Sequence, residues 1–121
     1  MDYFLTEEQQ MIKDLARQVA EERLKPLRAE MDEKGEFSWD VIKAYRESDL
    51  FGIYIPEEYG GLGGGVLELS LAVEELSRVC GGLSLGLAAT ALGTFPLLLF
   101  GSKEQKEQYL PALASGEKLA A

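Results

Sequence analysis

The sequence predicts an all-α fold, an orthogonal or up-down bundle of five to six helices within one domain. Apolar residues recur at helical spacing along most of the chain. They make up 46% of its 121 residues, which is enough for a packed core. The one apolar run that could be a strand has no partner strand elsewhere, so a sheet is not expected.

The first helix is predicted from its amino-terminal signal. Residues 6–9, Thr-Glu-Glu-Gln, form a capping box in which the side chains of Thr6 and Gln9 bond each other's backbone N–H groups. Pro26 is expected to interrupt or kink this helix, with a short helical piece at 27–32 continuing it. The apolar stripe of the helix consists of Met11, Ile12, Leu15, Ala16, Val19 and Ala20.

A second helix follows a turn at residues 34–36. Ser38 is placed to cap a helix over 39–48. Within it, Ile42 and Tyr45 are expected to face inward. The next segment, 50–55, is an apolar run that ends at a proline, and buried extended chain is the predicted conformation.

Residues 60–65 read Gly-Gly-Leu-Gly-Gly-Gly before a third helix predicted over 66–79. A glycine-rich loop before a helix can bind phosphate. Here neither the P-loop nor the dinucleotide-binding spacing is present, and the next basic residue is Arg78. A tight turn with positive φ angles is therefore the preferred interpretation.

The later helices are predicted from glycines, prolines and a second capping box. Gly81-Gly82 is expected to end the third helix, and a fourth helix is predicted at 83–92. A short helix that Pro96 starts or kinks then runs to about Gly101. A last helix opens at the capping box Ser102–Gln105, bends at Pro111 and ends at Gly116.

The stretch 79–102 contains no charged residue and is long enough to suggest a membrane span. The glycines at 81, 82, 86 and 93 and Pro96 argue against one, because a spanning helix needs continuous backbone hydrogen bonding. Two interpretations remain. The stretch is either a buried core helix or a helix whose small residues line an apolar cavity.

The composition excludes several kinds of site. A net charge of −9 disfavours nucleic acids and anionic membranes as partners. The chain has no histidine and only Cys80 as a thiol, so no Ser-His-Asp triad, Cys/His zinc site or intrachain disulfide can form, and no metal site is predicted. The start of the chain is acidic and lacks the basic region of a secretion signal, so a cytoplasmic location is expected.

Two carboxylate pairs could act as acids and bases, at Glu57-Glu58 and Glu74-Glu75. The second pair occupies adjacent helical positions, so one side chain can face the interior while the other faces solvent. Structural salt bridging, with Arg78 as a partner, is the preferred interpretation.

The ordered phrases of the chain resemble the amino-terminal domain of the acyl-CoA dehydrogenases from about residue 4 to the end. They are Leu-Thr-Glu-Glu-Gln at 5–9, Ile-Pro-Glu-Glu-Tyr-Gly-Gly-Leu-Gly at 55–63, Glu-Glu-Leu-Ser-Arg at 74–78, the run from Leu92-Gly93 to Pro96, and the segment from Gly101-Ser102 to Gly116-Glu117. Each phrase alone is weak, but their order and spacing together are specific.

The resemblance implies that residues 1–121 are one domain of a three-domain FAD enzyme, with a middle β-domain and a carboxy-terminal helical domain outside this chain. Such an enzyme uses a glutamate base to convert an acyl-CoA thioester to a trans-2-enoyl-CoA, and passes the electrons from FAD to an electron-transfer flavoprotein. A homotetramer is implied. The catalytic base and the main FAD contacts are expected outside the chain, so no catalytic and no cofactor-binding residue is assigned here.

The resemblance also implies two surfaces. The uncharged helix resembles the one that lines the acyl-chain pocket, which makes Ser84, Leu85, Ala88 and Leu92 the substrate-binding candidates. Ser84 and Ala88 are small, which suggests a deep or wide pocket. An apolar depression for the electron acceptor would lie at Ile12, Val19, Leu50, Leu62 and Ala72, although these positions also suit an ordinary core. The extra glycines at 63–65 suggest that its wall is loose.

Two other functions stay open. The chain could be a non-catalytic helical interaction domain, or the matching domain of an acyl-CoA oxidase or a flavin monooxygenase.

Overall fold

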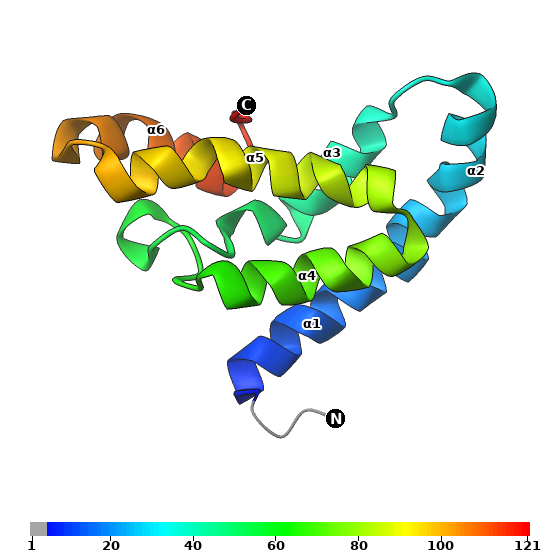
Figure 1. Cartoon of the computed structure of the whole chain (residues 1–121), viewed down its shortest axis with the longest axis horizontal. Coiled ribbons are helices and arrows are strands. Elements are labelled where there is room, and N and C mark those ends of the chain that lie inside the picture. The colour runs from blue at the N-terminus through cyan, green and yellow to red at the C-terminus, as the bar shows by residue number, and fades with distance from the viewer. Residues whose placement is uncertain (1–4) are drawn as a thin grey trace.

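The computed structural model describes residues 5–121, and this part of the chain is all-α without a strand (Figure 1). The prediction of an all-α bundle of five to six helices is confirmed. The helices are α1 (Glu7–Val19), α2 (Lys25–Lys34), α3 (Trp39–Glu47), α4 (Val66–Val79), α5 (Gly81–Phe100) and α6 (Lys103–Ser115). Between them lie a π-helical turn, η1 (Ala20–Leu24), and two 3₁₀ turns, η2 (Leu50–Gly52) and η3 (Glu57–Tyr59).

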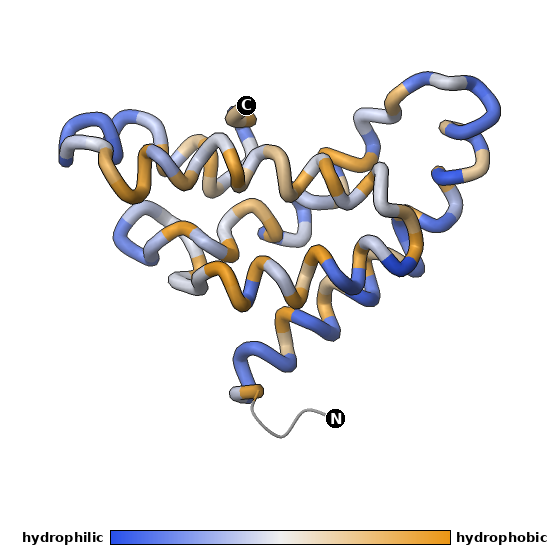
Figure 2. Tube along the Cα trace, in the orientation of Figure 1, coloured by the Kyte–Doolittle hydropathy of each residue, from blue (hydrophilic) through white to orange (hydrophobic). Residues whose placement is uncertain are grey.

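Helix α4 lies at the centre of the arrangement. It packs against α1 on one side and runs antiparallel to α5 on the other (Figure 1). The helices α3 and α6 pack against α5 and against η2, which places η2 in the core. By contrast, α2 has no buried residue and projects from the bundle as a largely hydrophilic segment (Figure 2).

The first helix begins as predicted and is interrupted before Pro26. The Thr6–Gln9 capping box is present in both directions. The expected interruption takes the form of the π turn η1, where the Lys25 N–H donates to the Ala20 carbonyl five residues earlier. Pro26 then occupies the first turn of α2, directly after this wider turn. The helix continues to Lys34, two residues beyond the predicted end.

The predicted extended segment at 50–55 is wrong in conformation, although its burial is confirmed. Asp49 adopts a left-handed conformation with a φ of 57°, which turns the chain into η2. The following amides bond carbonyls three residues earlier, as in the 3.0 Å bond from Gly52 to Asp49. Without a partner strand, these local bonds are how a buried segment satisfies its polar backbone.

The uncharged stretch forms one helix rather than two. The break between α4 and α5 falls at Cys80, which is extended, while Gly81 and Gly82 belong to the first turn of α5. The helix also continues through Pro96. A proline removes the bond to the carbonyl four residues earlier, which here belongs to Leu92. Both residues lie on the exposed side of α5, so the released carbonyl is not trapped in the core.

Among residues 5–121, α5 is the helix whose length and hydropathy would allow it to cross a membrane. Its contacts are those of a bundle helix, with α3, α4 and α6 packed along it. Only part of its surface is buried by these neighbours, so the first of the two interpretations, a buried core helix, describes only one side of α5. The rest of the surface is described below.

The buried core joins α1, α3, α4, α5 and α6 around Tyr45 and Phe51. Ile42 and Tyr45 face inward as predicted. The Tyr45 ring meets Phe51 edge-on, and its hydroxyl donates a 2.7 Å hydrogen bond to the Leu83 carbonyl at the start of α5. Burial raises the pKa of the Tyr45 hydroxyl. The predicted capping box at Ser102 opens α6, which runs through Pro111 to the left-handed Gly116.

Candidate functional site

Helix α5 carries an uncovered apolar stripe. Leu85, Leu92 and Leu99 follow one another at intervals of seven residues, so they lie on one face of the helix. Leu85 is 60% exposed and Leu92 is 74% exposed, on a helix that bears no charged residue. The α5 stripe, as this surface is called below, consists of Leu85, Ala88, Ala89, Leu92, Pro96 and Leu99.

The four substrate-binding candidates separate into two groups. Leu85, Ala88 and Leu92 belong to the α5 stripe. Ser84 lies beneath it and is buried between α4 and α5. Its hydroxyl is 2.8 Å from the Ser77 hydroxyl and donates to the Gly81 carbonyl. A role in substrate binding stays a prediction for all four residues.

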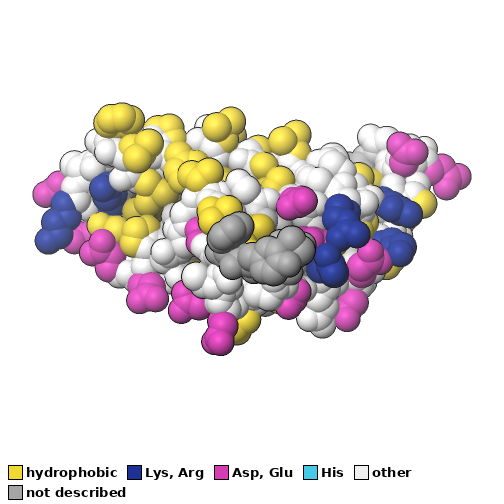
Figure 3. Space-filling view, turned by 60° about the horizontal axis from the view of Figure 1, so that its bottom comes forward, with side chains coloured by type: hydrophobic (Ala, Val, Ile, Leu, Met, Phe, Trp, Pro, Cys, Tyr) yellow, Lys and Arg dark blue, Asp and Glu magenta, His cyan; other side chains and the backbone are white. Residues whose placement is uncertain are grey.

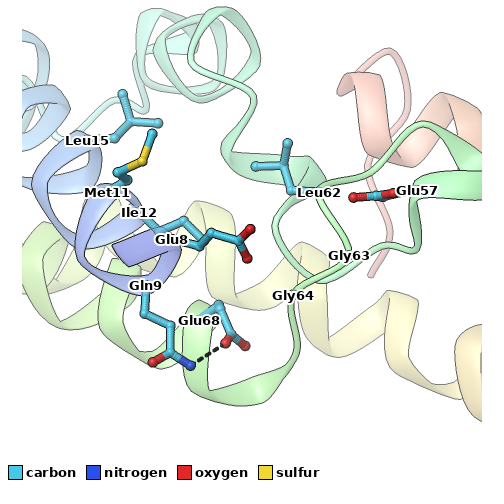
Figure 4. A pocket seen from close by; sticks show the side chains of 10 residues that line it. All are labelled: Glu8, Gln9, Met11, Ile12, Leu15, Glu57, Leu62, Gly63, Gly64 and Glu68. Atoms are coloured by element: carbon cyan, nitrogen blue, oxygen red, sulfur yellow. Dashed lines mark hydrogen bonds between the residues drawn. The ribbon is translucent and has the colours of Figure 1, made fainter. Parts of the chain in front are cut away.

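An apolar hollow of about 480 Å³ lies between α1, the start of α4 and the glycine loop (Figure 4). Its walls come from two separate parts of the sequence. Three carboxylates and one amide surround its mouth, and acidic side chains occur along the edge of this face of the molecule (Figure 3). The apolar hollow is lined by Met11, Ile12, Leu15, Leu62, Gly63 and Gly64, with Glu8, Gln9, Glu57 and Glu68 at its rim.

The five docking candidates also separate. Ile12 and Leu62 line the apolar hollow from opposite walls (Figure 4). Val19, Leu50 and Ala72 are buried in the core. Met11, which was not among the predicted docking residues, is 69% exposed and lines the hollow. Met11 belongs to the apolar stripe of the first helix, and membership of that stripe is the sequence feature that could have identified it as a lining residue. A docking role stays a prediction for all five residues.

The glycine loop is a turn, as predicted, and its amides are already bonded. Gly60 and Gly63 have φ angles of 88° and 74°, which favour glycine. Carbonyls of the buried segment before η3 accept three of the six loop amides, and a carboxylate accepts one more. These bonds run from Leu62 to Gly52, from Gly63 to Ile55, from Gly64 to Ile53, and from Gly65 to Glu68. The loop is tied down rather than loose, and these amides are not directed at a phosphate.

The Glu74-Glu75 pair divides between solvent and interior as predicted. Glu74 is exposed, whereas Glu75 is 3% exposed between α1 and α4. Arg17 donates to Glu75 through Nε at 3.0 Å and Nη2 at 3.1 Å, and Arg78 adds a bond of 3.1 Å. The Arg17 hydrogen bond lowers the pKa of the Glu75 carboxyl. The predicted salt bridge to Arg78 is confirmed, and Arg17 is an additional partner.

The hollows of the described residues do not fit FAD. The apolar hollow has three carboxylates at its rim, which would repel a pyrophosphate. A second hollow, near Arg17 and Arg78, measures about 140 Å³, and both arginines are bonded to Glu75. No cluster of potential metal ligands occurs within residues 5–121.

Comparison with known proteins places this architecture in a class of flavin-dependent dehydrogenases. The structure of butyryl-CoA dehydrogenase from Megasphaera elsdenii superimposes with a TM-score of 0.90 and 39% identity, covering 98% of this chain and 32% of that one. The short-chain-specific acyl-CoA dehydrogenase of Clostridium acetobutylicum is 43% identical over 122 residues. The acryloyl-CoA reductase (NADH) of Anaerotignum propionicum is 43% identical over 121 residues. The matches cover all of this chain and 32% and 31% of those proteins, respectively.

The model of the acyl-CoA dehydrogenase amino-terminal domain matches residues 6–117. The chain belongs to the acyl-CoA dehydrogenase family and corresponds to its amino-terminal helical domain. It spans about a third of the length of the curated relatives it matches.

Proposed function

We propose that the chain works as the amino-terminal domain of an FAD-dependent enzyme that converts an acyl-CoA thioester to a trans-2-enoyl-CoA. Family membership over residues 6–117 supports this proposal. So do the names of the relatives, which include a butyryl-CoA dehydrogenase and a short-chain-specific acyl-CoA dehydrogenase. The catalytic base and the FAD contacts are assigned to the two domains expected after residue 121.

The domain's own contribution to catalysis is one wall of the acyl-chain pocket. The observation that carries this assignment is the α5 stripe, an exposed apolar surface on a helix that bears no charge. An acyl tail that packs on such a surface gains about 0.8 kcal/mol for each methylene removed from water. Ala88 leaves room for the tail between Leu85 and Leu92, because these three residues lie on the same face of α5.

The second contribution is a docking surface for the electron-transfer flavoprotein at the apolar hollow. The hollow is open to solvent, and its walls carry exposed apolar side chains at Met11 and Leu62. Apolar concavities of this kind bind a protruding side chain of a protein partner. Only Ile12 and Leu62 of the original docking set are kept in this proposal, because the other three offer almost no surface.

Reduction of a 2-enoyl thioester is the second candidate activity. The relative named acryloyl-CoA reductase (NADH) is as similar to this chain as the short-chain dehydrogenase is. The α5 stripe would serve the oxidation of an acyl-CoA and the reduction of a 2-enoyl-CoA equally, because it contacts the acyl tail rather than the reacting carbons. Assaying the full-length polypeptide in both directions separates the two activities. The homotetramer and the cytoplasmic location stay predictions.

The pocket wall is tested by Ala88→Phe in the full-length polypeptide. The ring would fill space that about three methylenes of a long acyl tail occupy, and their loss is worth about 2.4 kcal/mol. The kcat/KM for long-chain acyl-CoA should therefore fall about fiftyfold, while that for butyryl-CoA changes little. Ala29→Phe on the projecting helix α2 is the control. An unchanged chain-length profile in the Ala88 variant would refute the pocket wall.

A further inference from the structure

The two walls of the apolar hollow are joined at its rim by one pair of side chains. Gln9 lies in the first turn of α1, and Glu68 lies in the first turn of α4. The Gln9 amide Nε2 donates to Glu68 Oε1 at 2.7 Å, a bond between residues 59 positions apart (Figure 4). Both side chains are half-buried.

Each member of the pair also caps the start of its own helix. Gln9 Oε1 accepts the Thr6 N–H at 3.0 Å, and Glu68 Oε2 accepts the Gly65 N–H at 2.7 Å. The cross-link therefore connects two helix caps in one continuous chain of hydrogen bonds. The bond from Gln9, followed by the backbone bonds, lowers the pKa of the Glu68 carboxyl, so this group is ionised at neutral pH.

Glu68 also sets the position of the glycine loop by packing. A Cβ atom added to Gly64 would lie 3.0 Å from Glu68 Cβ, 3.1 Å from Glu68 Cγ and 2.6 Å from the Ile53 carbonyl oxygen. The aliphatic stem of Glu68 thus occupies the space that a side chain at Gly64 would need. One residue therefore contacts the loop wall through carbon atoms and the α1 wall through its carboxylate.

We infer that the Gln9–Glu68 bridge fixes the spacing between the α1 wall and the glycine-loop wall, and thereby selects the side chain that a docking partner can insert. This inference rests on the proposed docking of the electron-transfer flavoprotein. Gln9 and Glu68 act as positioning residues in it, because their polar atoms already bond each other and the backbone. The partner meets the apolar side chains that they hold apart, chiefly Met11, Ile12 and Leu62.

In the Gln9–Glu68 bridge the amide donates and the carboxylate accepts, and a pair of substitutions can exchange these two roles. In Glu68→Gln, one amide N–H₂ group must face either the Gln9 amide or the Gly65 N–H, and donors do not bond donors. In Gln9→Glu, two carboxylate oxygens face each other. When both changes are made, the new carboxylate at position 9 accepts from Thr6 and from the new amide at position 68, whose oxygen accepts from Gly65. The exchange restores every hydrogen bond and leaves the net charge unchanged.

The test measures binding of the host organism's electron-transfer flavoprotein to the 121-residue chain by calorimetry. Each single substitution should raise the Kd about tenfold, the equivalent of one lost charged hydrogen bond, and the exchange should return it to within about twofold. Glu7→Gln is the charge-matched control for Glu68→Gln and should bind like the wild type. A bridge that merely stabilised the fold would leave the Kd unmoved, because nearly all molecules of a stable variant remain folded.

A second readout does not depend on the partner. Methyl NMR resonances of Met11, Ile12 and Leu62 should move in both single variants and return in the exchanged pair. The Leu62→Glu variant tests the docking proposal separately from the role of the Gln9–Glu68 bridge. If it leaves the Kd unchanged, the docking proposal is wrong, and the methyl shifts alone judge the bridge. If it weakens binding but neither bridge substitution does, or if the exchange fails to restore binding, the inference is overturned.

Discussion

Replacement of Glu75 by glutamine should destabilise the domain much more than the same change at Glu74. Glu75 is buried and accepts three hydrogen bonds from Arg17 and Arg78, whereas its neighbour faces solvent. A neutral amide keeps one acceptor atom and turns a donor toward the arginines. The variant is nearly isosteric, so packing is conserved and the electrostatic contribution is isolated.

The magnitude follows from the geometry. A hydrogen bond to a charged group contributes about 1.5–3 kcal/mol. The side chains of Arg17 and Arg78 are 51% and 63% exposed, so water screens them and replaces part of what is lost. We expect a net loss of about 2 kcal/mol for Glu75→Gln, and less than about 0.5 kcal/mol for Glu74→Gln. For a domain of this size, the first corresponds to a drop in Tm of about 8 °C.

Urea unfolding of the 121-residue chain, followed by circular dichroism, measures both variants. The pH dependence gives an independent check. Arg17 lowers the pKa of Glu75 in the folded state below its ordinary value of 4.5, so the folded protein binds this proton less readily than the unfolded chain. The stabilisation is therefore complete above pH 4.5 and is lost as the pH falls through the folded pKa. The reasoning is refuted if the two variants are equally stable at neutral pH, or if the gap between them does not narrow in acid.

Three further predictions concern the fold and the cofactor. Gly116→Ala should lower the free energy of unfolding in urea by about 2–3 kcal/mol, because the φ of Gly116 is 76° and an added Cβ would lie 2.7 Å from Phe51 Cδ2. A loss of stability below about 0.5 kcal/mol would contradict this expectation. Tyr45→Phe should lower the free energy of unfolding by about 1–2 kcal/mol, since the Leu83 carbonyl loses the hydroxyl that donates to it at 2.7 Å. Unchanged stability would mean that this carbonyl finds another donor. The purified 121-residue chain should carry no flavin; a stoichiometric flavin absorbance spectrum would contradict the assignment of the FAD site to other domains.

Helix starts were predictable because their signals are local. Thr6 and Ser102 each lie three residues before a glutamine, and that spacing alone completes a capping box. The division between Glu74 and Glu75 was likewise fixed by adjacent helical positions and a nearby arginine. Arg17 was not predicted as a partner, because it approaches Glu75 from a helix 58 residues away along the chain.

The errors lie where tertiary packing decides the conformation. Pro96 normally ends a helix, but here α5 is held along its length by three other helices and exposes the residue whose carbonyl loses its bond. The docking set mixed surface and core for a similar reason. Periodicity identifies an apolar face, but it does not say whether Leu50 or Leu62 is covered. Only the packing of η2 beneath the glycine loop shows this.

The central claim is that this domain serves an acyl-CoA-oxidising flavoenzyme. The most direct measurement is an anaerobic titration of the full-length polypeptide with acyl-CoA thioesters, followed by addition of its electron-transfer flavoprotein. The account predicts that acyl-CoA bleaches the bound flavin, that trans-2-enoyl-CoA forms, and that the added flavoprotein restores the oxidised spectrum by taking the electrons. A polypeptide without flavin, or a bound flavin that no acyl-CoA thioester reduces, would contradict the account.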